Sequence, residues 1–185
     1  MSRGVQAVVV CEDRQHEVFV RAFLLRRKFD RHKLRFEIAR QGKGDAKQFV
    51  RERFVLEVSA LRTYSGERRM LIAMTDADNL STAERRDSLI QACKTEKCDP
   101  PAAEDPIYIF TPKWEIETWL KFLRDGEADE SVNNLPKLIE PSDAYPLVNR
   151  LVDDMCDRQE IPSNSPPSLK LACKEYERMR DFLKP

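Results

Sequence analysis

Two short, continuous apolar runs constrain the fold of this chain more than any other feature. Residues 6–11 and 70–75 are each six residues long and rich in Val, Ile, Leu or Met. Strands of a parallel sheet are covered on both faces and therefore read as unbroken apolar runs. Helical patterns follow both runs, and this alternation is typical of α/β proteins. We therefore predict an α/β fold with a mostly parallel sheet flanked by helices.

Two further runs complete the predicted sheet. Residues 34–38 alternate between apolar and charged side chains, which indicates a strand with one solvated face near the sheet edge. Residues 107–111 are again continuously apolar up to a Thr. Apolar residues recur at helical spacing after each strand, over about 15–28, 45–59, 81–94 and from 116 onward.

Local signals mark the starts of two of these helices. Asp45 is a suitable N-cap, and Ser81 with Glu84 forms a capping box that satisfies backbone amides of the first turn. The turn Gly42-Lys43-Gly44 before Asp45 could hold a phosphate through exposed amides and Lys43, or could be no more than a turn. His16 falls in the first turn of the first helix, where we expect an ordinary surface residue.

Length and composition indicate one packed domain. With 185 residues, 41% of them apolar, the chain suits a single core with a helical appendage. We predict a core over residues 1–123 and a helical cap or extension of the same domain over 124–185, where two segments show helical spacing. No apolar run reaches the roughly 18–20 residues of a membrane span. We therefore expect a cytoplasmic protein with no membrane contact.

The five cysteines do not suggest a disulfide framework, because their number is odd and they are scattered. Cys93 and Cys98 have no second Cys or His pair at ligand spacing, so we expect no zinc site.

Charge is unevenly distributed although the net charge is zero. Residues 21–53 hold twelve Lys or Arg against four acids, and residues 125–160 hold ten acids against three basic residues. Two solvated helical faces would explain this. A basic face that contacts nucleic-acid phosphates is the alternative. On that hypothesis the contact residues are Arg26, Arg27, Lys28, Arg31 and Lys43.

Acids follow three of the four predicted strands. Glu12 follows the first, and Asp76 and Asp78 follow the third. Carboxyl ends of parallel strands share one edge of a sheet, where ligands of open α/β sheets bind. Acids at i and i+2 of an extended chain lie on one side and suit a hard cation. Acids that merely cap helices are the alternative interpretation.

Glu115 and Glu117 follow the fourth strand. On a helix they lie about 200° apart, so both can face one site only if the first turn is irregular. The sequence does not choose between them.

This order of acids resembles the Toprim domain, whose fold is Rossmann-like. Glu12 matches the motif glutamate, although Asp13 stands where the family usually has Gly. Asp76-Ala77-Asp78-Asn79 matches the Asp-x-Asp motif, and residues 112–117 resemble the late Glu-bearing segment. Over about residues 6–123 the chain is similar to small stand-alone Toprim-like proteins of the overcoming-lysogenization-defect (OLD) nuclease branch.

The resemblance implies a nuclease that cleaves phosphodiester bonds with one or two Mg²⁺ or Mn²⁺ ions. It implies DNA rather than RNA as substrate, and a phage-defence role beside a separate P-loop ATPase, since the chain has no Gly-x-x-x-x-Gly-Lys-Ser/Thr motif. An oligomer is compatible with these features. The implied metal ligands are Glu12, Asp76 and Asp78 with Glu115 or Glu117, and the implied phosphate-facing cation is Lys113.

Two other functions fit the same residues. A receiver-like phosphoacceptor domain would centre on Asp76, with Glu12 and Asp13 after the first strand and Thr111 and Lys113 near the last. A Toprim-like binding subunit without catalysis would keep the fold and contact nucleic acid or an ATPase.

Overall fold

The computed structural model describes residues 4–40, 44–66, 68–133, 135–136 and 143–184. At its centre is a four-stranded, wholly parallel sheet with the order β2-β1-β3-β4. The strands are β1 (Gln6–Cys11), β2 (Leu34–Ile38), β3 (Arg69–Met74) and β4 (Ile107–Phe110). The predicted α/β fold is therefore confirmed, including the central place of β1 and the edge place of β2.

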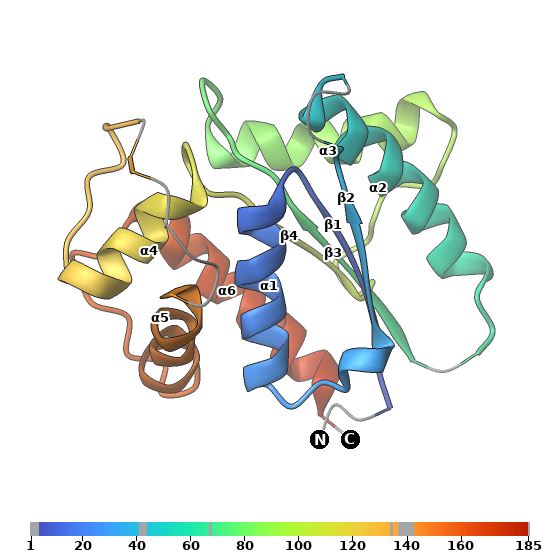
Figure 1. Cartoon of the computed structure of the whole chain (residues 1–185). Helices are drawn as coiled ribbons and strands as arrows, with labels where there is room; N and C mark the ends of the chain where they lie inside the picture. The colour runs from blue at the N-terminus through green and yellow to red at the C-terminus, as the bar shows by residue number, and fades with distance from the viewer. Residues whose placement is uncertain (1–3, 41–43, 67, 134, 137–142, 185) are drawn as a thin grey trace.

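Helices lie on both sides of this sheet (Figure 1). The capping box at Ser81 and the N-cap at Asp45 are both present. The Ser81 side chain accepts a hydrogen bond from the backbone amide of Glu84, and the Asp45 side chain accepts one from the amide of Lys47. The helices are α1 (Arg14–Arg26), η1 (Arg31–Lys33), α2 (Ala46–Thr63), α3 (Thr82–Thr95), α4 (Ile116–Asp125), α5 (Ala144–Arg150), the π-helix η3 (Leu151–Cys156) and α6 (Pro167–Leu183).

Successive residues of each strand feed two separate cores. Val8 and Val10 of β1 pack with α2 and α3, whereas Val9 and Cys11 pack with α1, α4, η3 and α6. Side chains alternate between the two faces of a strand, so an unbroken apolar strand supplies both cores at once. The apolar runs were continuous for this reason.

The order of crossings creates a switch point between β1 and β3. The β1–β2 connection passes over one face through α1, and the β2–β3 connection passes over the other through α2. Chain connections at the carboxyl ends of β1 and β3 therefore leave in opposite directions. In open α/β sheets, ligands bind in the crevice at such a point.

The C-terminal helices belong to the larger core. Leu151, Met155, Leu169 and Tyr176 are buried in the same cluster as β1, β3 and α1. The first of the two helical segments predicted after residue 124 is α5, which continues as the π-helix η3. Within the described part of the chain, we find no helix both long and apolar enough to cross a membrane.

Candidate functional site

Glu12 lies at the switch point, directly after β1. Its Oε1 atom accepts hydrogen bonds from the Thr75 hydroxyl and from the backbone amide of Asp76, the latter at 2.9 Å. Both partners follow β3, which pairs with β1 in parallel up to Cys11 and Met74. The acids after β1 and β3 were predicted to lie close together, and Glu12 and Asp76 do so.

The Glu12 carboxylate is in an unfavourable place for a negative charge. Burial raises the pKa of Glu12, and the nearby Asp76 raises it further, although hydrogen bonds from Thr75 and the Asp76 amide act in the opposite direction. A raised pKa means that folding favours the protonated form. A cation bound at this position would reverse that preference.

Asp76 is held by a buried histidine. His16 Nε2 lies 3.1 Å from Asp76 Oδ1, and the His16 side chain is 1% exposed. The Asp13 side chain caps α1 by accepting a hydrogen bond from the backbone amide of His16 at 2.9 Å. This bond fixes the first turn of α1, which carries His16. The expectation that His16 is an ordinary surface residue is wrong.

His16 also carries charge. Burial alone would lower the pKa of His16, but Asp76, Asp13 and Glu12 together raise it to about 9. The sequence contained a signal for this position: His16 precedes the buried Phe19 by three residues and therefore lies on the buried stripe of α1. Periodicity of the apolar residues alone did not reveal it, because His was not counted in the stripe.

Asp78 does not join Glu12 and Asp76. Its carboxylate forms an ion pair with Lys47 of α2 and lies 3.8 Å from Arg85 of α3, whereas Asp76 contacts α1 on the other face of the sheet. The extended chain expected over these residues ends early, since Asp78 has a φ of 51° and begins a turn closed by the Leu80 amide on the Ala77 carbonyl. The left-handed backbone turns Asp78 away.

Lys113 supports the loop that follows β3. Its ammonium group donates to the backbone carbonyls of Asp78 at 2.6 Å and Leu80 at 2.7 Å, and it lies 4.5 Å from the centre of the Trp114 ring. In this arrangement Lys113 holds the loop in place. Contact between Lys113 and a substrate phosphate stays a prediction.

Glu115 and Glu117 lie on either side of the first residue of α4. Glu115 is the N-cap of α4 and has an extended backbone, and its side chain accepts a hydrogen bond from the backbone amide of Leu135. Glu117 is in the first turn and is 5% exposed. The helix thus begins between the two acids, so the separation of about 200°, which holds for a helix that contains both, does not apply. A second metal position at these residues stays a prediction.

The basic segment predicted to bind nucleic acid lies at the opposite edge of the sheet. Helix α1 runs back from the carboxyl end of β1 toward the amino end of this strand (Figure 1). Arg26 is the last residue of α1, and Arg27 follows it. Arg26 Nε donates to Asp153 at 2.9 Å, and Arg27 donates to both oxygens of Asp157 at 2.7 and 3.0 Å.

The other members of the predicted nucleic-acid segment differ in their surroundings. Lys28 and Arg31 are exposed, also at the amino edge. Lys43 lies outside the described residues. Phosphate binding by these residues stays a prediction, but the structure separates the segment from Glu12 and Asp76.

A cleft of about 590 Å³ opens beside Thr75, between α2 and α3. Its charged lining residues are Lys47, Arg51 and Arg85 together with Asp45, Glu52 and Glu96. Basic side chains are therefore present close to the carboxyl edge. Lys47 and Arg51 belong to the basic stretch 21–53, but none of the three is among the contact residues predicted from the sequence.

The donor chemistry of Glu12 and Asp76 fits Mg²⁺. This ion is bound by one or two carboxylates and keeps several waters or substrate oxygens as its other ligands. Within residues 4–40, 44–66, 68–133, 135–136 and 143–184, no group of three or more His, Cys, Asp or Glu side chains is arranged to hold a metal. Asp78 is directed elsewhere, so of the predicted ligands after β1 and β3 only Glu12 and Asp76 lie together, and cation binding by these two stays a prediction.

Comparison of the chain with known protein families, curated proteins and solved structures found no match. The resemblance to Toprim domains therefore rests on the motif residues alone.

Proposed function

We propose that this chain cleaves phosphodiester bonds in nucleic acid, with Mg²⁺ or Mn²⁺ held by Glu12 and Asp76. The observation that carries the proposal is the contact between the Glu12 carboxylate and the Asp76 amide at the switch point of the sheet. A bound cation would stabilise charge on the attacking and leaving oxygens of an in-line displacement.

The surrounding residues keep the two carboxylates in fixed orientations. Thr75 and the Asp76 amide hold Glu12, and His16 holds Asp76. Ligand groups whose orientation is set before binding lose little conformational entropy when the ligand arrives. The proposal puts the substrate backbone along the cleft between α2 and α3, which opens beside Thr75, the hydroxyl donor to Glu12, and is lined by Lys47, Arg51 and Arg85 together with Asp45, Glu52 and Glu96.

Cleavage assays with matched variants test this function. Labelled DNA and RNA should be cut in Mn²⁺ or Mg²⁺ and left intact in EDTA, with or without a candidate ATPase partner. Glu12→Gln and Asp76→Asn should lower the rate at least about a hundredfold, the scale of losing one charge-stabilising group. Asp87→Asn, an exposed acid on α3, is the matched control and should cut at the wild-type rate. Equal cleavage by all four proteins would assign the activity to another site or to a contaminant.

Thermal unfolding gives a second readout that does not depend on activity. Mn²⁺ at a hundredfold excess over Kd should stabilise the wild type by about 2.7 kcal/mol. Glu12→Gln keeps both hydrogen bonds to Oε1 but removes a charge with a raised pKa, so in EDTA its Tm should be about 2–4 °C higher. The same variant should not respond to Mn²⁺. An unchanged response would remove Glu12 from the cation site.

One observation favours the receiver-like alternative. The strand order 2-1-3-4 is the order found at the start of flavodoxin-like sheets, and Thr111 is buried directly after β4. The position of Lys113 counts against it, since its ammonium binds backbone carbonyls rather than Asp76. Incubation with acetyl phosphate and Mg²⁺ decides the point, because a phosphoacceptor would carry a phosphoryl group on Asp76 that mass spectrometry detects.

A further inference from the structure

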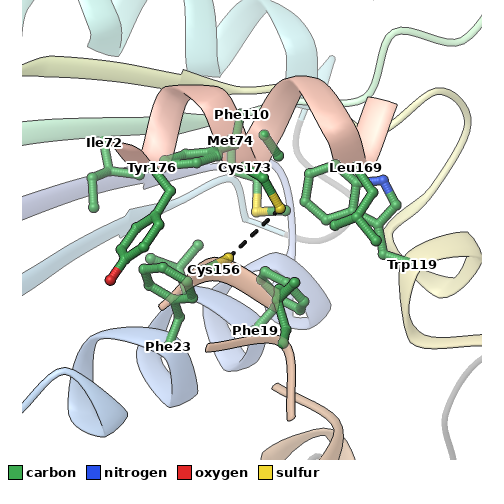
Figure 2. A pocket seen from close by; sticks show the side chains of 13 residues that line it. Phe19, Phe23, Ile72, Met74, Phe110, Trp119, Cys156, Leu169, Cys173 and Tyr176 are labelled. Carbon is green, nitrogen blue, oxygen red and sulfur yellow. Dashed lines mark hydrogen bonds between the residues drawn. The ribbon is translucent and has the colours of Figure 1, made fainter. Parts of the chain in front are cut away.

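A pair of thiols lies in the larger core, remote from the cleft and without a part in the proposed function. Cys156 is the last residue of η3, and Cys173 lies within α6. Their Sγ atoms are 3.6 Å apart, and the residues are 4% and 3% exposed. Figure 2 shows the two sulfur atoms facing each other between the two helices.

The space around the thiols is apolar and slightly underfilled. Phe19 and Phe23 of α1 line it on one side, and Trp119 and Tyr176 line it on others. The cavity has a volume of about 30 Å³. A cavity of this size leaves room for a very small molecule beside the sulfur atoms.

The remaining thiols have different neighbours. Cys11 Sγ lies 3.7 Å from the Asp13 carbonyl, and Cys98 Sγ accepts from the Ser59 hydroxyl at 3.2 Å. Cys93 lies near Cys98 at the end of α3, in the other core. All five cysteines are free thiols. The pair Cys93 and Cys98 therefore serves as an internal comparison for Cys156 and Cys173.

We propose that Cys156 and Cys173 form an oxidation site, at which a small peroxide converts the two thiols to a disulfide that joins η3 to α6. The Sγ atoms would move from 3.6 Å to about 2.05 Å apart. The adjacent cavity gives room for this movement. Cys156 is also at the end of its helix, where a small displacement disturbs few backbone hydrogen bonds.

Cys173 is the better initial nucleophile. Either thiol can donate the hydrogen bond between the two sulfur atoms, and when Cys156 donates it, this bond lowers the pKa of the Cys173 thiol, whereas burial raises it. Its sulfur attacks one peroxide oxygen, the O–O bond breaks, and the leaving hydroxide takes the thiol proton to become water. The Cys156 sulfur then attacks the sulfenic sulfur, the S–O bond breaks, and the oxygen leaves as a second water with the Cys156 proton. Two thiols lose two electrons in total, and one peroxide is reduced to two waters.

The disulfide would connect two helices that both contact α1. Asp153 of η3 and Asp157, which directly follows η3, hold Arg26 and Arg27, and the Tyr176 hydroxyl of α6 donates to Asp157 at 2.9 Å. Cross-linking residues 17 positions apart restricts the unfolded chain. We therefore expect the oxidised protein to unfold at a temperature roughly 6–12 °C higher.

The test uses the folded, reduced, full-length protein. After treatment with hydrogen peroxide and removal of the excess, alkylation in denaturant and peptide mapping should find Cys156 linked to Cys173 and the other three thiols alkylated. The Tm should rise by the stated amount and return after reduction. Cys156→Ser and Cys173→Ser should show neither change, whereas the matched variant Cys93→Ser should show both.

Several results would overturn the proposal, and the mapping of the wild type needs no variant to fold. Five alkylated thiols after peroxide treatment would show that the pair does not react. A link between Cys93 and Cys98, or sulfinic acid at Cys173 without a link, would show that proximity in the core does not direct the oxidation.

Discussion

At the carboxyl edge of the sheet Glu12 and Asp76 lie beside each other, whereas at the amino edge Arg26 lies beside Asp153 of η3 and Arg27 beside Asp157, the residue after η3. Burial and the like charge of Asp76 raise the pKa of Glu12, and the buried His16 acts in the opposite direction. The arginines, by contrast, are paired within the chain. A long run of charge in the sequence can thus be neutralised by the fold, while two acids after adjacent strands stay together.

Removing Asp76 should break the arrangement at the carboxyl edge. Asp76→Ala leaves the buried His16 without its closest partner, and breaking a buried pair in this way costs about 3 kcal/mol of unfolding free energy. Urea unfolding at pH 7 measures this loss. Asp87→Asn, which changes an exposed acid, should leave the unfolding free energy within about 0.5 kcal/mol of wild type.

The same measurement above pH 9 separates charge from packing. There His16 is neutral in both proteins, because its pKa in the fold is about 9. The difference between wild type and Asp76→Ala should therefore shrink. An equal loss at both pH values would mean that the carboxylate acts through packing or backbone contacts rather than through its charge.

The pH dependence of the wild type should show the second largest effect. Folding raises the pKa of His16 from the usual 6.5 to about 9, so the protonated form is favoured in the folded state. This stabilisation is fully present below about pH 6.5 and is lost as the pH rises through 9. We expect a decrease of roughly 2–3 kcal/mol in unfolding free energy over that window, which His16→Gln should lack. Parallel curves for the two proteins would contradict a charged His16.

Local signals predicted most of the fold. The apolar runs became β1 and β3, and the cap residues Asp45 and Ser81 start α2 and α3 as their chemistry requires. Glu12 and Asp76 could be placed together for the same reason, since parallel neighbours bring their carboxyl ends to one edge. These inferences needed no knowledge of distant packing.

Features that depend on distant packing or on a single backbone angle could not be predicted in this way. Asp78 leaves the site because of its positive φ, which an Asp-x-Asp spacing does not reveal. Arg26 pairs with an acid 127 residues away in the sequence. The structure of η3 as a π-helix gave no periodic signal, although it brings Cys156 to Cys173. The charge run therefore did not reveal that Arg26 and Arg27 are paired within the chain.

The smallest predicted effect concerns the amino edge and tests whether its charge is available to a ligand. Arg27 donates to both oxygens of the partly exposed Asp157, a pair of a kind that contributes about 0.2–1 kcal/mol in water. A double-mutant cycle with Arg27→Ala and Asp157→Ala should give a coupling in that range. Because this arginine is already paired and lies away from Glu12, Arg27→Ala should bind nucleic acid as the wild type does.

Arg51→Ala is the matched comparison for this last prediction, since Arg51 is an exposed arginine lining the cleft between α2 and α3. Loss of one phosphate contact lowers the affinity for nucleic acid. It also reduces the slope of the logarithm of the affinity against the logarithm of the salt concentration by about 1. We expect that change for Arg51→Ala and not for Arg27→Ala. The reverse result would mean that the ion pairs of the amino edge open for phosphates, and that the basic run in the sequence, rather than the cleft, marks the nucleic-acid surface.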